Sequence, residues 1–382
     1  MNTSKDHQRP KRQRIILLLD LDCFYAQCEM IRLNIDRNVP LCLLQWNSAL
    51  AINYPARDLY KFKRGVSFDE IQKKSQGKCV ALHLPVISLD ATSTYYREDD
   101  MIQSIYDREY NQPQHIKAQM YEKEKNVMRK PHEGKASIER YRIASACIFE
   151  TIKNALDYQK ITYRKNKMKH SKSDINQCDD ISESDHWFIL EKASIDELYL
   201  DVTNICYDFA VDLVWNEHHT PSDDNDDDDA NSKTQDDLSL IEQMALEETF
   251  ICAKDNIIQS TGLLSNDNKK DFDLIIDDND DDIIKALRRG CTIARGIRKV
   301  VYDKLGFTLS AGISTSKLVA KLGASYGKPN GQAVVFPQAI PFVMNETPIR
   351  KARNLGGKIG KEVGISNIIL LNIGSNNCIL TV

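Results

Sequence analysis

Two apolar runs joined by an acidic turn constrain the fold of this chain most. The segments "HWFILEKA" (186–193) and "ELYLDVT" (197–203) each have the composition of a β-strand, and the turn between them holds Asp196 and Glu197. So short a connection joins antiparallel neighbours, which predicts a β-hairpin. Neighbouring side chains of a regular strand point to opposite faces, so two adjacent carboxylates here have two interpretations. They form either an ordinary polar turn or a turn that brings both carboxylates to one metal-binding pocket.

The remaining apolar periodicity predicts further strands and helices. Strands are expected over 14–19, 40–46, 50–54, 79–86 and 307–314, and at the end of 327–335. Helices are expected from Phe24, around Asp69, over 138–158, 283–306 and 315–326, and as short pieces within 340–367. Residues 95–135 are expected to be mostly loop with local helix, and 160–185 a polar linker. The order strand, helix, hairpin, helix, strand predicts an α+β fold in which helices cover one face of a mostly antiparallel sheet and leave the other face open.

The charge of the chain is unevenly distributed. The formal net charge is -4, but residues 221–282 contain 20 Asp and Glu against four Lys, a net charge of -16, so the other 320 residues carry +12. The low-complexity run "PSDDNDDDDANSK" (221–233) predicts disorder in this acidic insert, with a helix over 238–258 inside it. The basic remainder predicts a polyanionic partner such as nucleic acid.

Other features of the composition indicate a soluble intracellular protein. The ten cysteines form no CxxC pair, which argues against a zinc site or a disulfide framework. No apolar stretch approaches the roughly 20 residues of a membrane span, and the run 15–19 is too short for a signal peptide before Asp20 ends it. The run "RPKRQR" (9–14) is either a nuclear address or a solvated tail.

Acidic residues at strand ends predict a metal site. Asp20 ends the first strand and Asp22 follows two residues later, where the turn with Asp196 and Glu197 can approach in a split βαβ sheet. Carboxylates so close raise one another's pKa unless cations neutralise them. Hard oxygen ligands select Mg²⁺, and two such ions about 4 Å apart serve in-line phosphoryl transfer.

Four segments in order make the chain similar to a known family. These are "LLLDLDCFYAQCE", "NYPARDLYKFKRG", "ASIDELYLDVT" and "LSAGISTSKLVAKLGASYGKPNGQ". Together they resemble the Y-family translesion DNA polymerases, most closely the eta branch, over roughly residues 14–365. The resemblance implies a right-handed polymerase with a ferredoxin-like split βαβ palm, small fingers and a small helical thumb. The expected boundaries are a basic tail (1–13), palm (14–22 and 88–337, with the insert 221–282), fingers (23–87) and thumb (338–382).

The resemblance also implies a metal site. Its ligands are the side chains of Asp20, Asp196 and Glu197 and the backbone carbonyl of Leu21, holding two Mg²⁺ ions, or Mn²⁺ in their place. Spacing alone nominates Asp22 as a partner of Asp20, whereas the resemblance makes it only a neighbour.

The same resemblance implies a nucleotide pocket. Its members are Tyr25 as a steric gate against a 2'-hydroxyl, Tyr54, Arg57 and Lys328 on the triphosphate, Arg64 on the base and phosphates, and Gln45 facing the template base. Guanidinium groups suit phosphate because they bind its oxygens in a fork. Without the surrounding motifs, an ordinary core aromatic at the start of a helix is the default interpretation of Tyr25, and an ordinary turn lysine is the alternative for Lys328.

The final segment departs from the family pattern. "RNLGGKIGKEV" resembles the helix-hairpin-helix of the polymerase thumb, with Gly356 and Gly357 approaching a DNA phosphate and Lys358 and Lys361 adding charge. A glycine that ends a helix is the alternative. The family continues into a little-finger domain, and because the sequence ends at Val382 we expect that domain to be absent here. Either the sequence is a fragment or a mis-spliced product, or a partner supplies the grip on DNA.

The resemblance implies a DNA-directed DNA polymerase that works in the nucleus on damaged templates such as UV photoproducts. Its expected partners are primer–template DNA and deoxynucleoside triphosphates, with a sliding clamp or ubiquitinated clamp as a further partner and no membrane. Three alternatives stay open: another branch of the family (kappa-like or a deoxycytidyl transferase), a non-catalytic DNA-binding scaffold, and a nucleotidyl cyclase, against which the fingers and thumb motifs argue.

Overall fold

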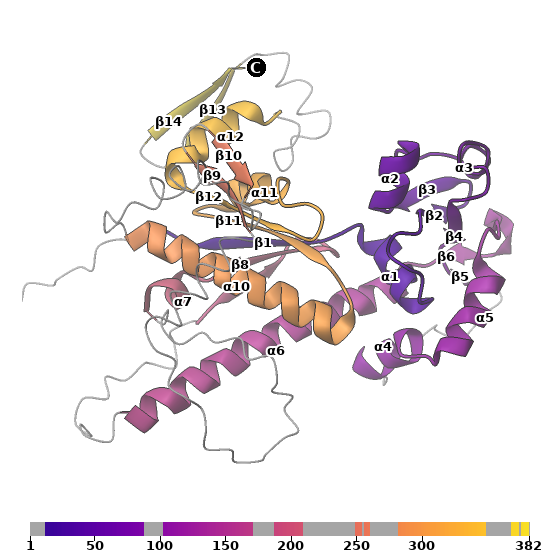
Figure 1. The fold of residues 1–382 in the computed structure, drawn as a ribbon, viewed down its shortest axis with the longest axis horizontal. Helices are drawn as coiled ribbons and strands as arrows, with labels where there is room; N and C mark the ends of the chain where they lie inside the picture. The colour runs from indigo at the N-terminus through magenta and orange to yellow at the C-terminus, as the bar shows by residue number, and fades with distance from the viewer. Residues whose placement is uncertain are drawn as a thin grey trace, which may run out of the picture.

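The structure is a computed structural model that describes residues 12–87, 102–170, 187–208, 249–253, 256–259, 282–348, 368–373 and 376–381. The predicted disordered run 221–233 and the thumb residues Gly356, Gly357, Lys358 and Lys361 lie outside the described residues. Figure 1 shows a large sheet with its helices on one side of the molecule and a smaller lobe on the other.

A seven-stranded sheet forms the centre of the larger part. Its strands are β1 (Ile16–Leu21), β7 (Ile189–Lys192), β8 (Glu197–Asp201), β9 (Thr249–Ala253), β10 (Asn256–Gln259), β11 (Leu309–Ser314) and β12 (Gln332–Val335). Their order is β10-β9-β12-β11-β1-β8-β7. β12 pairs in parallel with β11 and β9, and the other neighbours are antiparallel. The predicted hairpin is therefore confirmed as β7–β8, and the sub-order β11-β1-β8-β7 is that of a split βαβ unit.

Helices cover both faces of this sheet. α6 (Glu139–His170) and α10 (Asp282–Leu305) lie on one face, and α11 (Lys317–Ala324) lies on the other (Figure 1). A Cβ atom added to Gly312 of β11 would stand 1.9 Å from the Ala320 carbonyl oxygen, so α11 packs directly onto the strand. The expectation of an open second face is wrong at this place, because glycine and alanine leave room for a helix against the sheet.

The smaller lobe is built from early parts of the chain. Its three-stranded sheet has the order β3-β2-β4, with β2 (Leu41–Gln45), β3 (Ser48–Ile52) and β4 (Val80–His83). The helices of the lobe are α1 (Phe24–Arg32), α2 (Tyr54–Tyr60), α3 (Phe68–Ser75), α4 (Ile102–Tyr110) and α5 (Gln114–Glu124), and β5 (Val86–Ile87) pairs with β6 (Lys135–Ala136). The strands predicted over 40–46 and 79–86 are thus confirmed as β2 and β4, whereas the strand predicted over 50–54 lies two residues earlier, as β3, because Asn53 caps α2.

Shorter elements complete the described chain. These are η1 (Pro131–Glu133), α7 (Thr203–Asp208), η2 (Pro337–Ala339), α12 (Ile340–Glu346) and the hairpin of β13 (Ile368–Ile373) and β14 (Asn376–Thr381). In the part of the chain described, no helix is long and apolar enough to cross a membrane.

Three expectations about local structure are wrong. Residues 102–124 are largely helical rather than loop, and α6 continues to His170 inside the predicted linker. The helix predicted over 238–258 is contradicted by β9 and β10, so the acidic insert is not disordered throughout. The run "TFICA" is rich in β-branched and aromatic residues, and pairing with β12 buries Ile251 and Cys252.

A buried ion cluster ties α1 to α6. One Glu29 oxygen accepts hydrogen bonds from Tyr141 Oη (2.7 Å) and Arg140 (3.1 Å), and the other accepts two from Arg32 (2.8 and 2.6 Å). Arg32 also bonds Glu124 of α5. Burial raises the pKa of Glu29, but the two guanidinium groups and the Tyr141 hydroxyl outweigh it and lower that pKa to about 2. The smaller lobe is thus held to α6 by charge-assisted hydrogen bonds inside the core.

Candidate functional site

Three acidic residues gather at one end of two neighbouring strands. In the β1–β8 register Asp20 lies opposite Glu197, and the Leu21 amide donates to the Asp196 carbonyl at 2.9 Å. Ser194 shapes the turn, because its hydroxyl donates to the Asp196 carboxylate (2.5 Å) and accepts from the Glu197 amide (3.0 Å). The tertiary structure therefore brings the three acidic residues that the sequence nominated to the same end of β1 and β8.

Two of these carboxylates form ion pairs with lysines. Lys328 Nζ lies 2.6 Å from Asp20 Oδ2, and Lys321 Nζ lies 2.6 and 2.7 Å from the two oxygens of Glu197. Burial raises the pKa of Asp20 to about 6; Lys328 opposes the rise, while Glu197 and Asp196 add to it. The site therefore favours the presence of positive charge.

Sequence reasoning missed Lys321. It lies within the apolar run "KLVAKLGA" of α11, and that helix packs on β1, the strand that carries Asp20. The sequence shows a lysine in an apolar helix. It does not show that this helix packs on the strand with the acidic residues, which is what would have identified Lys321.

The donor set suits a hard divalent cation. Carboxylate oxygens of Asp20, Asp196 and Glu197, with the neighbouring Leu21 carbonyl, are the oxygen ligands that Mg²⁺ and Mn²⁺ take. The two lysine ammonium groups on Asp20 and Glu197 show that these carboxylates attract cations. Among the described residues, no group of three His, Cys, Asp or Glu side chains is arranged as a metal cluster in this conformation. The chemistry of these residues fits a divalent cation, and in this structure the ammonium groups of Lys321 and Lys328 are paired with the carboxylates of Glu197 and Asp20.

Asp22 has a different role from Asp20. Its side chain is buried, and its two oxygens accept hydrogen bonds from Ser310 Oγ (2.7 Å) and the Asn330 amide (2.9 Å). These bonds tie the end of β1 to β11 and to the loop that carries Lys328. Asp22 is therefore an anchor of the loop.

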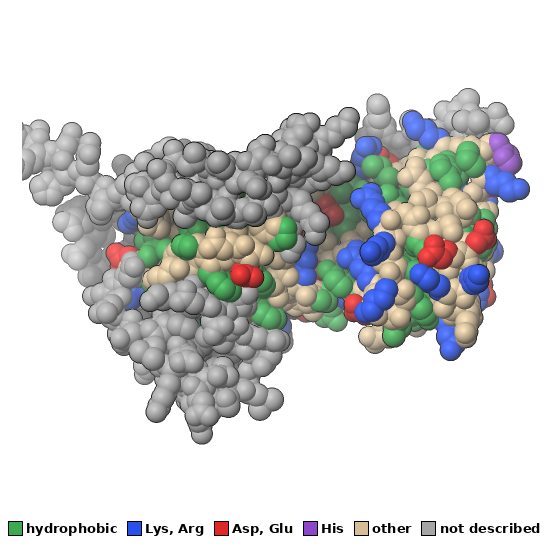
Figure 2. All heavy atoms as spheres, turned by 90° about the horizontal axis from the view of Figure 1, so that it is seen from above, with side chains coloured by type: hydrophobic (Ala, Val, Ile, Leu, Met, Phe, Trp, Pro, Cys, Tyr) green, Lys and Arg blue, Asp and Glu red, His purple; other side chains and the backbone are tan. Residues whose placement is uncertain are grey.

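A pocket of about 420 Å³ adjoins Asp196. Its lining includes Tyr25, Arg57 and Arg64, which come from α1, from α2 and from the loop before α3. Figure 2 shows basic side chains along the edge of the smaller lobe that faces the hollow between the two parts of the molecule. The structure thus places three of the predicted nucleotide contacts in one cavity beside the acidic group.

Local interactions hold the basic and aromatic groups of this pocket. The Asn53 side chain accepts from the Ala56 amide and begins α2 (3.1 Å), and the Arg57 guanidinium lies over the Tyr54 ring at 5.2 Å. Burial, with Asp22 close by, raises the pKa of Tyr54. Burial and then Asp196 raise the pKa of Tyr25. Both phenols are therefore neutral donors at physiological pH.

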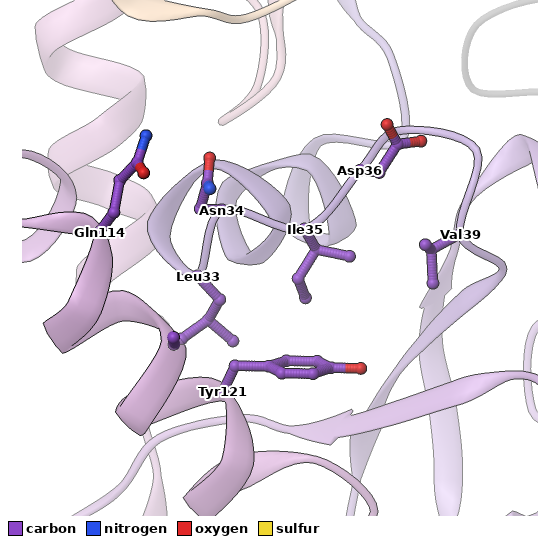
Figure 3. A pocket seen from close by; sticks show the side chains of 8 residues that line it. Leu33, Asn34, Ile35, Asp36, Val39, Gln114 and Tyr121 are labelled. Carbon is purple, nitrogen blue, oxygen red and sulfur yellow. The ribbon is translucent and has the colours of Figure 1, made fainter.

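Three predicted contacts, Tyr54, Gln45 and Lys328, are not among the described residues that line this pocket; Tyr54 lies beneath the Arg57 guanidinium. Gln45 is exposed at the end of β2 opposite Ser48. Lys328, expected at a triphosphate, lies against Asp20. A second pocket of about 270 Å³ between the end of α1 and α5 is lined by Asp36 and Tyr121 among others (Figure 3), and it contains none of the predicted site residues.

Comparison with known proteins shows which proteins this chain is similar to. The sequence pattern of the impB/mucB/samB family matches residues 19–325. DNA polymerase eta of Saccharomyces cerevisiae is 27% identical over 90% of this chain and 46% of its own length. DNA polymerase eta of Drosophila melanogaster is 23% identical over 95% of this chain and 32% of its own length. DNA polymerase IV of Protochlamydia amoebophila is 34% identical over 24% of this chain and 26% of its own length.

The comparisons agree with the resemblance drawn from the four sequence segments, which is thereby confirmed. This chain spans less than half the length of the two eta relatives, and the match to DNA polymerase IV covers about a quarter of that protein.

Proposed function

Because this chain belongs to the impB/mucB/samB family, we propose that it is a template-directed DNA polymerase that adds deoxynucleotides to a primer end opposite damaged bases. The observation that carries the proposal is the acidic group of Asp20, Asp196 and Glu197 directly beside a pocket lined by Tyr25, Arg57 and Arg64. Relatives named DNA polymerase eta support eta-like bypass, for example of UV photoproducts, as the specialisation.

Each group has a defined task under this proposal. Arg57 and Arg64 bind phosphate oxygens of the incoming nucleotide, because a guanidinium offers several donors in a plane. Tyr25 packs against the sugar and rejects a 2'-hydroxyl by repulsion. Lys328 releases Asp20 when a triphosphate offers it a stronger anion, which returns it to the contact expected from the sequence.

Asp20, Asp196, Glu197 and the Leu21 carbonyl would hold two Mg²⁺ or Mn²⁺ ions. When bound, such ions stabilise the attacking and leaving oxygens of an in-line phosphoryl transfer. The protein's own contribution is to fix these ligands at strand ends and, before the ions bind, to neutralise Glu197 and Asp20 through Lys321 and Lys328.

The names of the parts follow from the same proposal. Residues 14–22 and 88–337, with the seven-stranded sheet, are the palm; residues 23–87, which form part of the smaller lobe, are the fingers; and residues 338–382 belong to the thumb. Gly356, Gly357, Lys358 and Lys361 contact a DNA phosphate in this scheme. Primer–template DNA and deoxynucleoside triphosphates are the substrates, a sliding clamp or its ubiquitinated form is a further partner, and the nucleus is the place of action.

Primer extension tests the proposal. Asp196→Ala and Glu197→Ala should each lower the extension rate below about a tenth of the unmodified chain, which corresponds to about 1.4 kcal/mol of barrier. Glu191→Ala is the matched control, because Glu191 is an exposed acidic residue of the same hairpin that pairs with Lys317. Its extension rate should be unchanged.

Two outcomes would decide against the polymerase assignment. Extension above about a tenth of the normal rate in both site variants would remove the acidic group from catalysis. If the unmodified chain binds primer–template DNA but never extends it at low salt, where phosphate contacts are strongest, a non-catalytic DNA-binding scaffold is the better assignment.

A further inference from the structure

The ring of Tyr25 is packed against a second tyrosine from a distant part of the chain. The ring centroids of Tyr25 and Tyr141 are 4.9 Å apart, and the planes meet at 76°, an edge-to-face contact. Tyr141 is fully buried in the first turns of α6. Tyr25 lines the pocket beside Asp196. The half-buried Tyr25 ring therefore lines the pocket, and the fully buried Tyr141 ring lies in contact with it.

The buried ring is held in place by the ion cluster. Tyr141 Oη donates to Glu29 at 2.7 Å, and Glu29 follows Tyr25 by four residues on α1, which places the two on the same face of the helix. The Tyr141 ring contacts Tyr25, and its hydroxyl contacts Glu29.

The charges around Glu29 leave this arrangement little freedom. Arg32 bonds one of its oxygens and Arg140 the other. Arg140 also bonds Glu109 of α4 at 2.8 Å. A fully satisfied buried network of this kind is rigid, because moving any member leaves a charge unpaired in the interior.

We propose that Tyr141, held by Glu29, is a positioning residue that sets the sugar selectivity of the pocket by preventing the Tyr25 ring from yielding. Rejection by repulsion is only as strong as the resistance of the rejecting group, because a ring that can move aside admits the larger sugar. Close packing behind a side chain supplies that resistance. The inference rests on the proposed polymerase function and deepens it by assigning selectivity to a residue that does not touch the nucleotide.

The test compares ribonucleotide with deoxynucleotide insertion in the full chain. Tyr141→Leu, which removes the supporting ring, should lower the ratio of deoxynucleotide to ribonucleotide kcat/KM by about tenfold, a change of about 1.4 kcal/mol. Tyr141→Phe keeps the ring and loses the bond to Glu29, so the ratio should fall by about threefold. Deoxynucleotide kcat/KM should stay within about twofold of normal in both variants.

Tyr106→Phe is the matched control. Tyr106 is also buried, its ring stacks on Tyr110, and its hydroxyl faces the Leu305 carbonyl at 3.5 Å. Removing this hydroxyl should leave the sugar ratio unchanged. Thermal unfolding of every variant separates a change of selectivity from a loss of folded protein.

Tyr25→Ala separates the failure of this inference from the failure of the function. If Tyr25→Ala lowers the sugar ratio while both Tyr141 variants leave it unchanged, the inference is overturned and the polymerase proposal stands. If the unmodified chain extends no primer, the polymerase proposal fails, and equilibrium binding of dATP and ATP then decides. A dATP/ATP affinity ratio that is the same in the unmodified chain and in Tyr141→Leu overturns the positioning role, and a lowered ratio supports it.

Discussion

Lys321 and Glu197 form a bidentate ion pair, in which the lysine Nζ lies 2.6 Å from one carboxylate oxygen and 2.7 Å from the other. The pair joins α11 on one face of the sheet to the first residue of β8. Because Asp20 lies opposite Glu197 in the register, the lysine charge reduces the repulsion within the acidic group.

Removal of this charge should make the stability of the protein depend on divalent cations. Lys321→Met keeps the length of the side chain and leaves Glu197 without its cation. In EDTA the free energy of unfolding should therefore fall by about 1 kcal/mol, as for a partly exposed ion pair, and the melting temperature should fall with it. Added Mg²⁺ should raise the melting temperature of Lys321→Met more than that of the unmodified chain.

Lys317→Met is the control for Lys321→Met, because Lys317 belongs to the same helix but pairs with the exposed Glu191. Its response to Mg²⁺ should equal that of the unmodified chain. Equal Mg²⁺ responses in all three proteins, measured by differential scanning fluorimetry, would contradict a role of Lys321 at the cation site.

Asp22 should act on stability through the loop it anchors. Asp22→Ala leaves the Ser310 hydroxyl and the Asn330 amide without their acceptor, which should cost about 1–3 kcal/mol in urea unfolding. Asp22→Asn keeps one acceptor oxygen and should lose less. A direct ligand of the metal would instead show normal stability together with weakened Mn²⁺ binding, and that result would contradict the anchoring role.

The Glu29 cluster should make the protein sensitive to acid. The pKa of Glu29 is lowered to about 2 from its ordinary value of 4.5, so the folded state favours the ionised form. Its contribution to stability is fully present above about pH 4.5 and is lost as the pH falls toward 2. Glu29→Gln, which breaks a buried pair, should cost about 3–5 kcal/mol at neutral pH.

The measurement for Glu29 is the difference in unfolding free energy between the unmodified chain and Glu29→Gln across this pH range. The difference should shrink as the pH falls from 4.5 toward 2. A difference that stays constant down to pH 2 would show that the carboxylate charge is not what stabilises the cluster.

The effect of deleting the acidic segment on the melting temperature should depend on whether the deletion includes β9 and β10. Removing residues 221–282 also removes β9 and β10, and burial of Ile251 and Cys252 contributes on the order of 3 kcal/mol. The melting temperature should fall by about 5–10 °C. Removing residues 223–237 leaves both strands in the chain and should not change it; equal melting temperatures for the two deletions would show that β9 adds nothing to the sheet.

The sequence by itself determined the features that depend on neighbours in the chain. Apolar periodicity was sufficient for the helix that became α10 and for the hairpin β7–β8, because each is stabilised by a pattern within one segment. The strand end at Asp20 and the turn at Asp196 also follow from local pattern. Once a split βαβ order is expected, their approach follows from the topology, as the β1–β8 register confirms.

Only the tertiary structure decided which side chains meet around those carboxylates. Lys321 and Glu197 are 124 positions apart, and Tyr141 and Glu29 are 112 positions apart. Nothing in either local pattern specifies such a pairing. The strand β9 shows the same limit, because a helix was predicted over 238–258 while its pairing with β12 placed β9 in the core. The apolar periodicity of a segment indicates which of its faces is buried. The partner of a buried charge depends instead on which distant segment packs against it.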